Sequence, residues 1–406
     1  MIAAARTPLA PHVAVIGLVE SARGALLFTL LPNHLRFGVG HQMSVVGLAL
    51  SAYYIAELAA KVPSGWLVDH WGRRVPLYGG ITLSLLAVVM FSRVESTAAI
   101  LLAAAIGGLG ASPVWPSVVS GVAEATEPGG RGGAMGAVFT SWMIGTGTGF
   151  VVANFLLEIH TAVAFGFVAG CLTGALVFAR RIIADRSTGR VQEALRESVH
   201  EVEITAARLW PLIGGMFLQT VSIGMLMPIL SPYAREVLSL SPFWIGVLLV
   251  AGPGLTVLLL VPLGRTIDRV DRVEVLPAAL ALGAAVLFAL PFFRSLWILI
   301  PLVAILGLGY ATMLPAWNAL IMDLLPPSRR ATLLGLAMSI EGMGIAFGTT
   351  IGGVLWDSFG PSTPFHAAAV LLVVVAMGYV ALLPKSVEPV LNRRARRAVD
   401  RTGPHP

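Results

Sequence analysis

Twelve apolar stretches, each near the roughly 20 residues that a helix needs to cross a bilayer, follow one another along this chain. Backbone polar groups find no water inside lipid, so a spanning segment of this length must be an α-helix. The sequence therefore predicts an all-α integral membrane protein with 12 transmembrane helices. The stretches cover residues 12–31, 43–67, 77–92, 98–122, 132–157, 160–180, 210–231, 242–263, 275–293, 296–322, 331–356 and 362–383.

The composition agrees with a membrane protein. Charged residues make up 12% of the 406 residues, against about 25% in a soluble protein. The first stretch contains Glu20 and Arg23, and no small-residue cleavage site follows it, so we expect a true span and not a removable signal peptide. The single cysteine, Cys171, excludes an intramolecular disulfide, and we interpret it as a small buried side chain.

The basic residues are distributed unevenly between the two sides of the predicted membrane. Of the 27 Lys and Arg, 21 fall on one side, and four fall on the other, namely Arg36, Arg93, Arg235 and Arg294. Because cytoplasmic loops carry such an excess, we predict a multi-pass protein of the inner (plasma) membrane with both termini cytoplasmic. The formal net charge of +6 is then a topology signal, and we expect no nucleic-acid partner.

The chain also contains an internal repeat with an offset of 199 residues. The charged turn Gly65–Arg74 returns at Gly264–Arg272, and Gly108-Leu109-Gly110 returns at Gly307-Leu308-Gly309 without a gap. Two parallel copies of a six-helix unit are one plan of secondary transporters. We therefore predict an N-terminal bundle over 1–180, a cytoplasmic linker over 181–209, a C-terminal bundle over 210–385 and a basic cytoplasmic tail over 386–406.

The first charged turn reads G-x-L-x-D-x-x-G-R-R, which resembles the signature loop of the major facilitator superfamily. The second copy departs from this pattern, with Asp271 at the position of the second glycine. The resemblance implies a secondary transporter that works by alternating access. The expected conformational gate combines both turns with the junction after the fourth span, at Gly65, Asp69, Gly72, Arg73, Arg74, Glu124, Arg131, Asp268 and Arg272; alternatively, these charges only anchor the topology.

Glycines in the fifth span give a weaker indication of transport direction. Gly136, Gly145 and Gly149 have the spacing that begins the antiporter motif of exporter members, which resembles G-x8-G-x3-G. The proline and glycine pair that should follow are absent, and glycines at this spacing also permit close helix packing. Ala104 stands where proton-linked drug exporters carry an arginine, which argues against their standard proton mechanism.

Ionisable residues inside spans are expensive, so each is a functional candidate. Glu20 and Arg23 lie one helical turn apart, and Glu57 and Lys61 lie on one face of the second span, where they can pair with each other or with the first span. The proton-coupling candidates are Glu20, Glu57, Lys61 and Glu341. The substrate-binding candidates are Glu20, Arg23, Trp115, Trp142, Gln219 and Asn318.

Each candidate also has a structural interpretation. Glu20 and Arg23 can form a buried ion pair, and Lys61 can extend to the cytoplasmic surface. Glu341 can bind a proton reversibly, because burial favours the neutral carboxyl group, or it can remain neutral and hydrogen-bonded. A single tryptophan in a membrane helix often serves packing or interface anchoring.

Glu-x-x-Arg in the first span, with tryptophans in the fourth and fifth, is similar to glycolipid flippases that supply lipoteichoic-acid synthesis. That resemblance implies substrate roles for Glu20, Arg23, Trp115 and Trp142. We expect proton-linked export or flipping of an amphipathic or hydrophobic molecule, drug-like or lipid-linked, by a monomer in the bilayer. The alternatives are proton-coupled uptake of a polar metabolite (a sugar, carboxylate or amino acid) and a non-transporting receptor or scaffold.

Three common motifs of energy use and hydrolysis are missing from the sequence. The chain has no G-x-x-x-x-G-K-[ST] loop, no H-E-x-x-H and no G-x-S-x-G. We therefore expect no direct ATP drive, no enzyme activity, and neither a cofactor nor a metal.

Overall fold

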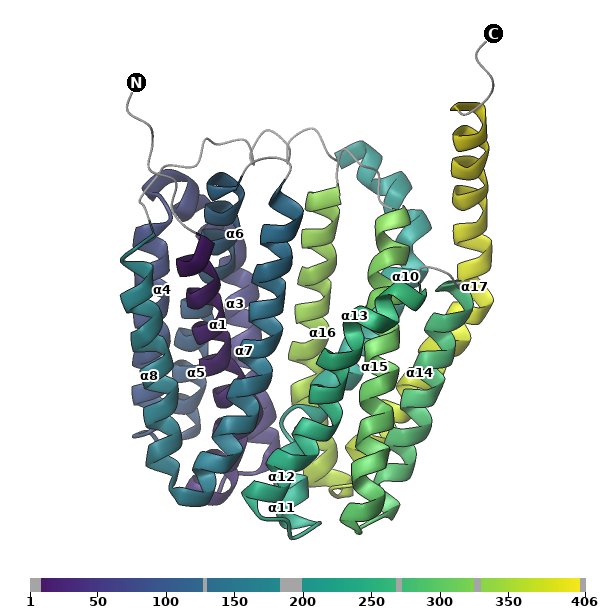
Figure 1. Cartoon of the computed structure of the whole chain (residues 1–406). Coiled ribbons are helices and arrows are strands. Elements are labelled where there is room, and N and C mark those ends of the chain that lie inside the picture. Colours follow the sequence, from purple (N-terminus) through teal and green to yellow (C-terminus); the bar gives the residue numbers. More distant parts are fainter. Residues whose placement is uncertain (1–8, 127–129, 183–198, 268–271, 325–329, 402–406) are drawn as a thin grey trace, which may run out of the picture. The chain divides into compact units, whose positions relative to one another are not determined.

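The computed structural model describes residues 9–126, 130–182, 199–267, 272–324 and 330–401, and the regular elements in these ranges are all helices (Figure 1). Eleven segments of this described part are long and apolar enough to cross a membrane. The remaining predicted span, 331–356, lies within helix α16 (Arg330–Phe359). That helix carries Glu341 as well as several glycines and threonines. The predicted all-α membrane fold is confirmed.

The helices before residue 182 follow the predicted spans closely. The first span is continuous but changes helix type along its length, with two π-helical segments. The elements are α1 (Leu9–Ala25), η1 (Leu26–Leu30), α2 (Leu31–Asn33), η2 (His34–Val39), α3 (Met43–Trp71), α4 (Arg74–Phe91), α5 (Thr97–Ala111), α6 (Val114–Ala125), α7 (Arg131–Ile159) and α8 (Thr161–Ala179).

The helices after residue 199 repeat this order. They are α10 (Val199–Leu226), α11 (Leu230–Glu236), α12 (Pro242–Leu249), η4 (Val250–Gly254), α13 (Leu255–Ile267), α14 (Arg272–Ala289), η5 (Leu290–Phe292), α15 (Leu296–Leu324), α16 and α17 (Thr363–Arg401). Helices α12, α15 and α16 begin 199 residues after α3, α5 and α7 respectively, so the sequence repeat is also a repeat of helix boundaries.

The chain forms two compact units. Unit 1 comprises Met1–Gly189, Ile223–Val250 and Ile345–Pro364, and unit 2 comprises Arg190–Ser222, Ala251–Gly344 and Phe365–Pro406. Unit 1 therefore combines the first repeat with two segments of the second. The domain boundaries expected from the sequence stay a prediction.

Glycines bring α1 and α7 of unit 1 into close contact (Figure 1). A Cβ atom added at Gly24 would lie under 3.0 Å from the Thr146 backbone oxygen, and one added at Gly149 would lie equally close to that of Ser21. Gly145 faces Gly17 in the same way, whereas a Cβ at Gly136 would meet nothing within 4 Å. Gly145 and Gly149 thus serve helix packing, which sets α1 beside the polar side chains of α7.

Two chain breaks position the expected functional residues. Helix α3 ends at Gly72, whose φ of 76° lies in the left-handed region that favours glycine, so the second glycine of the signature turn has a backbone reason. The fourth span is interrupted between α5 and α6 at Ser112 and Pro113, which places Trp115 in the first turn of α6.

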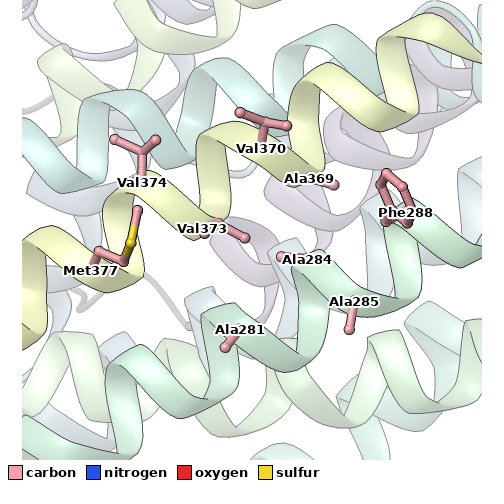
Figure 2. A pocket seen from close by; sticks show the side chains of 9 residues that line it. All are labelled: Ala281, Ala284, Ala285, Phe288, Ala369, Val370, Val373, Val374 and Met377. Atoms are coloured by element: carbon pink, nitrogen blue, oxygen red, sulfur yellow. The ribbon is translucent and has the colours of Figure 1, made fainter.

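In unit 2, helices α14 and α17 border a groove of about 400 Å³ (Figure 2). The side chains that line it are all apolar: Ala281, Ala284, Ala285 and Phe288 from α14, and Ala369, Val370, Val373, Val374 and Met377 from α17. These side chains offer no hydrogen bond, so the groove suits apolar groups.

Candidate functional site

A buried ion pair joins α1 to α3 in unit 1. The Arg23 guanidinium donates two hydrogen bonds to the Glu57 carboxylate, from Nη2 to Oε2 at 2.6 Å and from Nη1 to Oε1 at 3.3 Å. The two side chains are 18% and 8% exposed. Such a fork of two parallel bonds is the strong form of an arginine–carboxylate contact. Of the pairings that the sequence left open for Glu57, the structure shows the one with the first span.

A second carboxylate, that of Glu20, lies beside this pair. Its Oε1 is 3.9 Å from Arg23 Nη1, and its side chain is 3% exposed. It accepts hydrogen bonds from Trp115 Nε1 at 3.3 Å and from Thr146 Oγ1 at 3.4 Å. Both bonds are longer than the usual 2.7–3.2 Å of protein hydrogen bonds. Glu20 is therefore held much less tightly than Glu57.

Aromatic rings surround the charges. The rings of Tyr53 and Tyr54 have their centroids 5.6 and 5.4 Å from Arg23 Cζ, which is within the range of cation–π attraction. The rings of Trp115 and Trp142 meet edge to face with 6.3 Å between centroids. The structure thus brings together four residues predicted to bind substrate, and it adds two tyrosines.

The charges of this cluster do not balance. One guanidinium faces two carboxylates, and Glu57 already neutralises Arg23 through two bonds. A buried carboxylate without its own counter-charge is unfavourable, so Glu20 is stabilised either by a proton or by hydrogen-bond donors. The cluster can therefore exchange a proton for the hydroxyl or amine donors of a ligand.

Sequence reasoning missed Tyr53, Tyr54 and Thr146, because uncharged side chains are common in membrane helices. A signal was present in their spacing. The two tyrosines precede Glu57 by four and three residues, and Thr146 follows Trp142 by four, so each shares a helix face with a predicted site residue. The Thr146 hydroxyl has a single proton, and the Trp142 carbonyl, 3.0 Å away, competes with Glu20 for it.

The other candidates lie elsewhere. Gln219 is buried on α10, and its Oε1 has no hydrogen-bond partner among the described residues. Asn318 is exposed on α15 and donates to the Leu314 carbonyl at 2.9 Å. Glu341 on α16 interacts electrostatically with Tyr310. These residues belong to unit 2, so their place in one site with Glu20 stays a prediction, as does a proton role for the partly exposed Lys61 of α3.

Part of the predicted gate is present in unit 1. Arg73 is buried and forms an ion pair with Glu124 of α6, and the Arg74 guanidinium lies 5.7 Å from the Tyr78 ring centroid. Gly65 and Asp69 occupy the last two turns of α3. Asp268 and the side chains of Arg131 and Arg272 fall outside the described part of the chain. Whether this set acts as a gate stays a prediction.

Two repeats of membrane-spanning helices with ionisable groups buried among them define the class of secondary transporters. The comparisons agree. The family model of the Major Facilitator Superfamily matches residues 13–213 and 212–403, and the chain belongs to this family. The predicted transporter fold and class are confirmed.

Among curated proteins, the chain is similar to the proton-coupled antiporter flippase LtaA. It is 26% identical over 372 residues to that of Staphylococcus haemolyticus (strain JCSC1435), a match that covers 90% of this chain and 92% of the relative. The flippase of Staphylococcus aureus (strain USA300) is 28% identical over 376 residues, with the same coverage.

Solved transporters share the fold. A bacterial homologue of the human lysosomal transporter Spinster, in an inward-facing and unoccupied conformation, matches with a TM-score of 0.77 and 15% identity over 94% of this chain and 97% of its own. The nucleoside transporter NupG matches with a TM-score of 0.74 and 13% identity over 92% of this chain and 98% of its own. At these identities the likeness concerns the fold alone.

Proposed function

We propose that this protein is a proton-coupled antiporter that flips a lipid-linked molecule with a neutral, hydroxyl-rich head group across the plasma membrane. It acts as a monomer, transports without catalysing a reaction, has both termini in the cytoplasm and has no nucleic-acid partner. The similarity to proton-coupled antiporter flippases over 90% of the chain supports the lipid-linked substrate and the proton coupling.

The proposal rests on the difference in hydrogen-bond length between the two carboxylates, those of Glu57 and Glu20. Glu57 stays paired with Arg23 through a 2.6 Å bond, whereas Glu20 has two long bonds that a ligand can replace. A ligand hydroxyl forms its strongest hydrogen bond with an ionised Glu20 carboxylate. A proton on Glu20 removes the negative charge, turns one oxygen into a donor and leaves a weaker acceptor. Substrate and proton therefore compete at Glu20, which is the condition for antiport.

The surroundings of Glu20 favour a sugar-like head group. Trp115 and Trp142 supply broad apolar ring surfaces beside the carboxylate, and aromatic faces together with hydrogen-bond acceptors suit a ring that carries both C–H and O–H groups. An anionic head group fits less well, because it would compete with Glu57 for Arg23 and add a negative charge beside Glu20.

The test uses the purified protein in proteoliposomes with an imposed pH gradient and a fluorescent diacylglycerol that carries a neutral disaccharide. The wild type should flip this lipid with a rate that depends on the gradient, and Glu20→Gln should flip it at the same slow rate with or without the gradient. Glu95→Gln, at an exposed acid that is not part of the cluster, is the control and should behave as the wild type.

The other outcomes distinguish the alternatives. Proton flux on addition of soluble amphiphilic cations, without lipid movement, would replace flipping by export of soluble amphiphiles. Counterflow that a water-soluble metabolite saturates would replace it by uptake, with Glu20 and Arg23 clamping the metabolite. A Glu20→Gln variant that keeps its full dependence on the gradient would remove Glu20 from the coupling.

A further inference from the structure

Two carboxylates at helix C-termini in unit 1 cap helices of the opposite sequence repeat. Asp357 of α16 accepts hydrogen bonds from the first two backbone N–H groups of α3, from Met43 to Oδ1 at 3.1 Å and from Ser44 to Oδ2 at 2.7 Å. Glu158 of α7 accepts a bond from Phe243 N of α12 to its Oε2 at 3.2 Å. Neither α3 nor α12 has a cap from the side chain of its own N-cap residue.

The two caps are related by the same 199-residue offset that relates the repeats. Glu158 corresponds to Asp357, and Ser44 corresponds to Phe243. The two caps differ in one respect, since Asp357 receives two bonds and Glu158 one. The difference has a simple cause. The counterpart of Met43 is Pro242, which has no N–H to donate.

A second pair of contacts obeys the same symmetry. The Arg36 guanidinium donates to both oxygens of Glu236, from Nη2 at 2.9 Å and from Nε at 3.1 Å. Their repeat counterparts, Arg235 and Phe37, are also in contact, with Arg235 Cζ 4.4 Å from the Phe37 ring centroid. Arg36 contacts Glu236, and the two residues that occupy the equivalent positions of the other repeat, Arg235 and Phe37, contact each other as well. Such reciprocal contacts are typical of a two-fold interface.

All four contacts join the two repeats, and they involve the ends of spans remote from the Gly65–Arg74 turn. A helix N-terminus suits a contact that must break and re-form, because its first N–H groups have no partner within the helix. When the carboxylate leaves, water can take its place and the helix stays intact. The helix dipole meanwhile favours a negative charge at this end.

We propose that Asp357, Glu158 and the Arg36–Glu236 pair form a pseudo-two-fold latch that closes the extracytoplasmic side of the transporter and breaks in each transport cycle. The proposal rests on the alternating-access part of the function above and is independent of which molecule is moved. Because Asp357 accepts two backbone hydrogen bonds and Glu158 accepts one, the Asp357 cap is the stronger of the two caps.

The experiment measures opening directly, with a reporter thiol at a buried position behind the latch. Thr349 of α16 is 0% exposed, and its Oγ1 lies 2.8 Å from Ser51 Oγ of α3. Thr349→Cys is made in a Cys171→Ser background, and its reaction with a membrane-impermeant maleimide is followed from each face of oriented vesicles. Asp357→Asn should raise the rate from the face opposite the tail about tenfold, and Glu158→Gln about threefold.

Matched variants separate the latch from general loosening. Glu95→Gln removes an exposed carboxylate and should leave the rate unchanged. Arg36→Glu and Glu236→Arg should each raise the rate, and the double variant should restore it because the pair is reversed. This swap also tests the latch if Asp357→Asn does not fold.

Two results would overturn the latch. One is a labelling rate that Asp357→Asn and Glu158→Gln leave unchanged, and the other is an increase confined to the face of the tail. The proposed substrate is tested separately, because loss of lipid flipping with the expected labelling rates would overturn the flippase and leave the latch in place.

Discussion

The contact between α1 and α7 can be tested with one methyl group. Gly149→Ala places a Cβ under 3.0 Å from the Ser21 backbone oxygen, and backbone atoms cannot move aside as a flexible side chain can. Overpacking of this kind costs about 1–3 kcal/mol. Against it stands the gain of about 1 kcal/mol when alanine replaces glycine in a helix. We therefore expect Gly149→Ala to lower the stability of the protein, or at most to leave it unchanged.

Gly147 supplies the matched control two residues away on the same helix. A Cβ at Gly147 meets nothing within 4 Å, so Gly147→Ala should show the helix gain alone. The measurement is the thermal unfolding midpoint of each purified variant in detergent. Gly149→Ala should unfold below the wild type, and Gly147→Ala should unfold at or above it.

The same substitution has a functional consequence, because relief of the clash must separate the two helices. The Thr146–Glu20 hydrogen bond is already 3.4 Å long and would be lost first. Equal midpoints for the two variants, or a more stable Gly149→Ala, would refute the glycine-mediated contact and with it this explanation of how Glu20 is positioned.

Three further substitutions test individual contacts. Arg23→Lys replaces a two-bond fork by a point charge, and unfolding should become easier by about 1–3 kcal/mol, seen as a lower thermal midpoint. Glu57→Gln leaves Arg23 with Glu20 as its remaining acid, so gradient-driven flipping should fall while an exposed-acid variant retains it. Gly72→Ala places a side chain on a backbone with φ 76° and ψ 167°, a conformation that costs a non-glycine residue about 1–3 kcal/mol. Gly65→Ala within α3 meets nothing within 4 Å and should not destabilise the protein, so equal thermal midpoints would contradict this prediction.

The spans were predictable because hydropathy follows directly from residue identity. Helix ends were less predictable where polar residues remain helical. The predicted second span stops at residue 67, but α3 continues to Trp71, because the chain leaves the helical conformation only at Gly72. The Gly72 φ angle, and not the loss of apolar residues, sets the boundary.

Partners across helices could not be predicted from spacing alone. The i,i+4 relation of Glu57 and Lys61 left open a pair within one helix and a pair with the first span, and the structure shows the second, between Glu57 and Arg23. Sequence spacing describes one helix at a time, whereas the distance between helices depends on packing contacts such as those of Gly24 and Gly149. The capping roles of Glu158 and Asp357 escaped notice for the same reason, although the 199-residue offset relates them.

The tryptophan pair gives this site an optical signal of its own. Trp115 and Trp142 are two of only nine tryptophans, and their rings lie 6.3 Å apart at 68° to each other. Indole transitions at this separation couple, so the pair should contribute a distinctive band to the near-ultraviolet circular dichroism. Because Trp115 Nε1 donates to Glu20, a ligand that takes over the Glu20 carboxylate releases the indole and alters that band. Occupancy of the site can then be followed in the unlabelled protein.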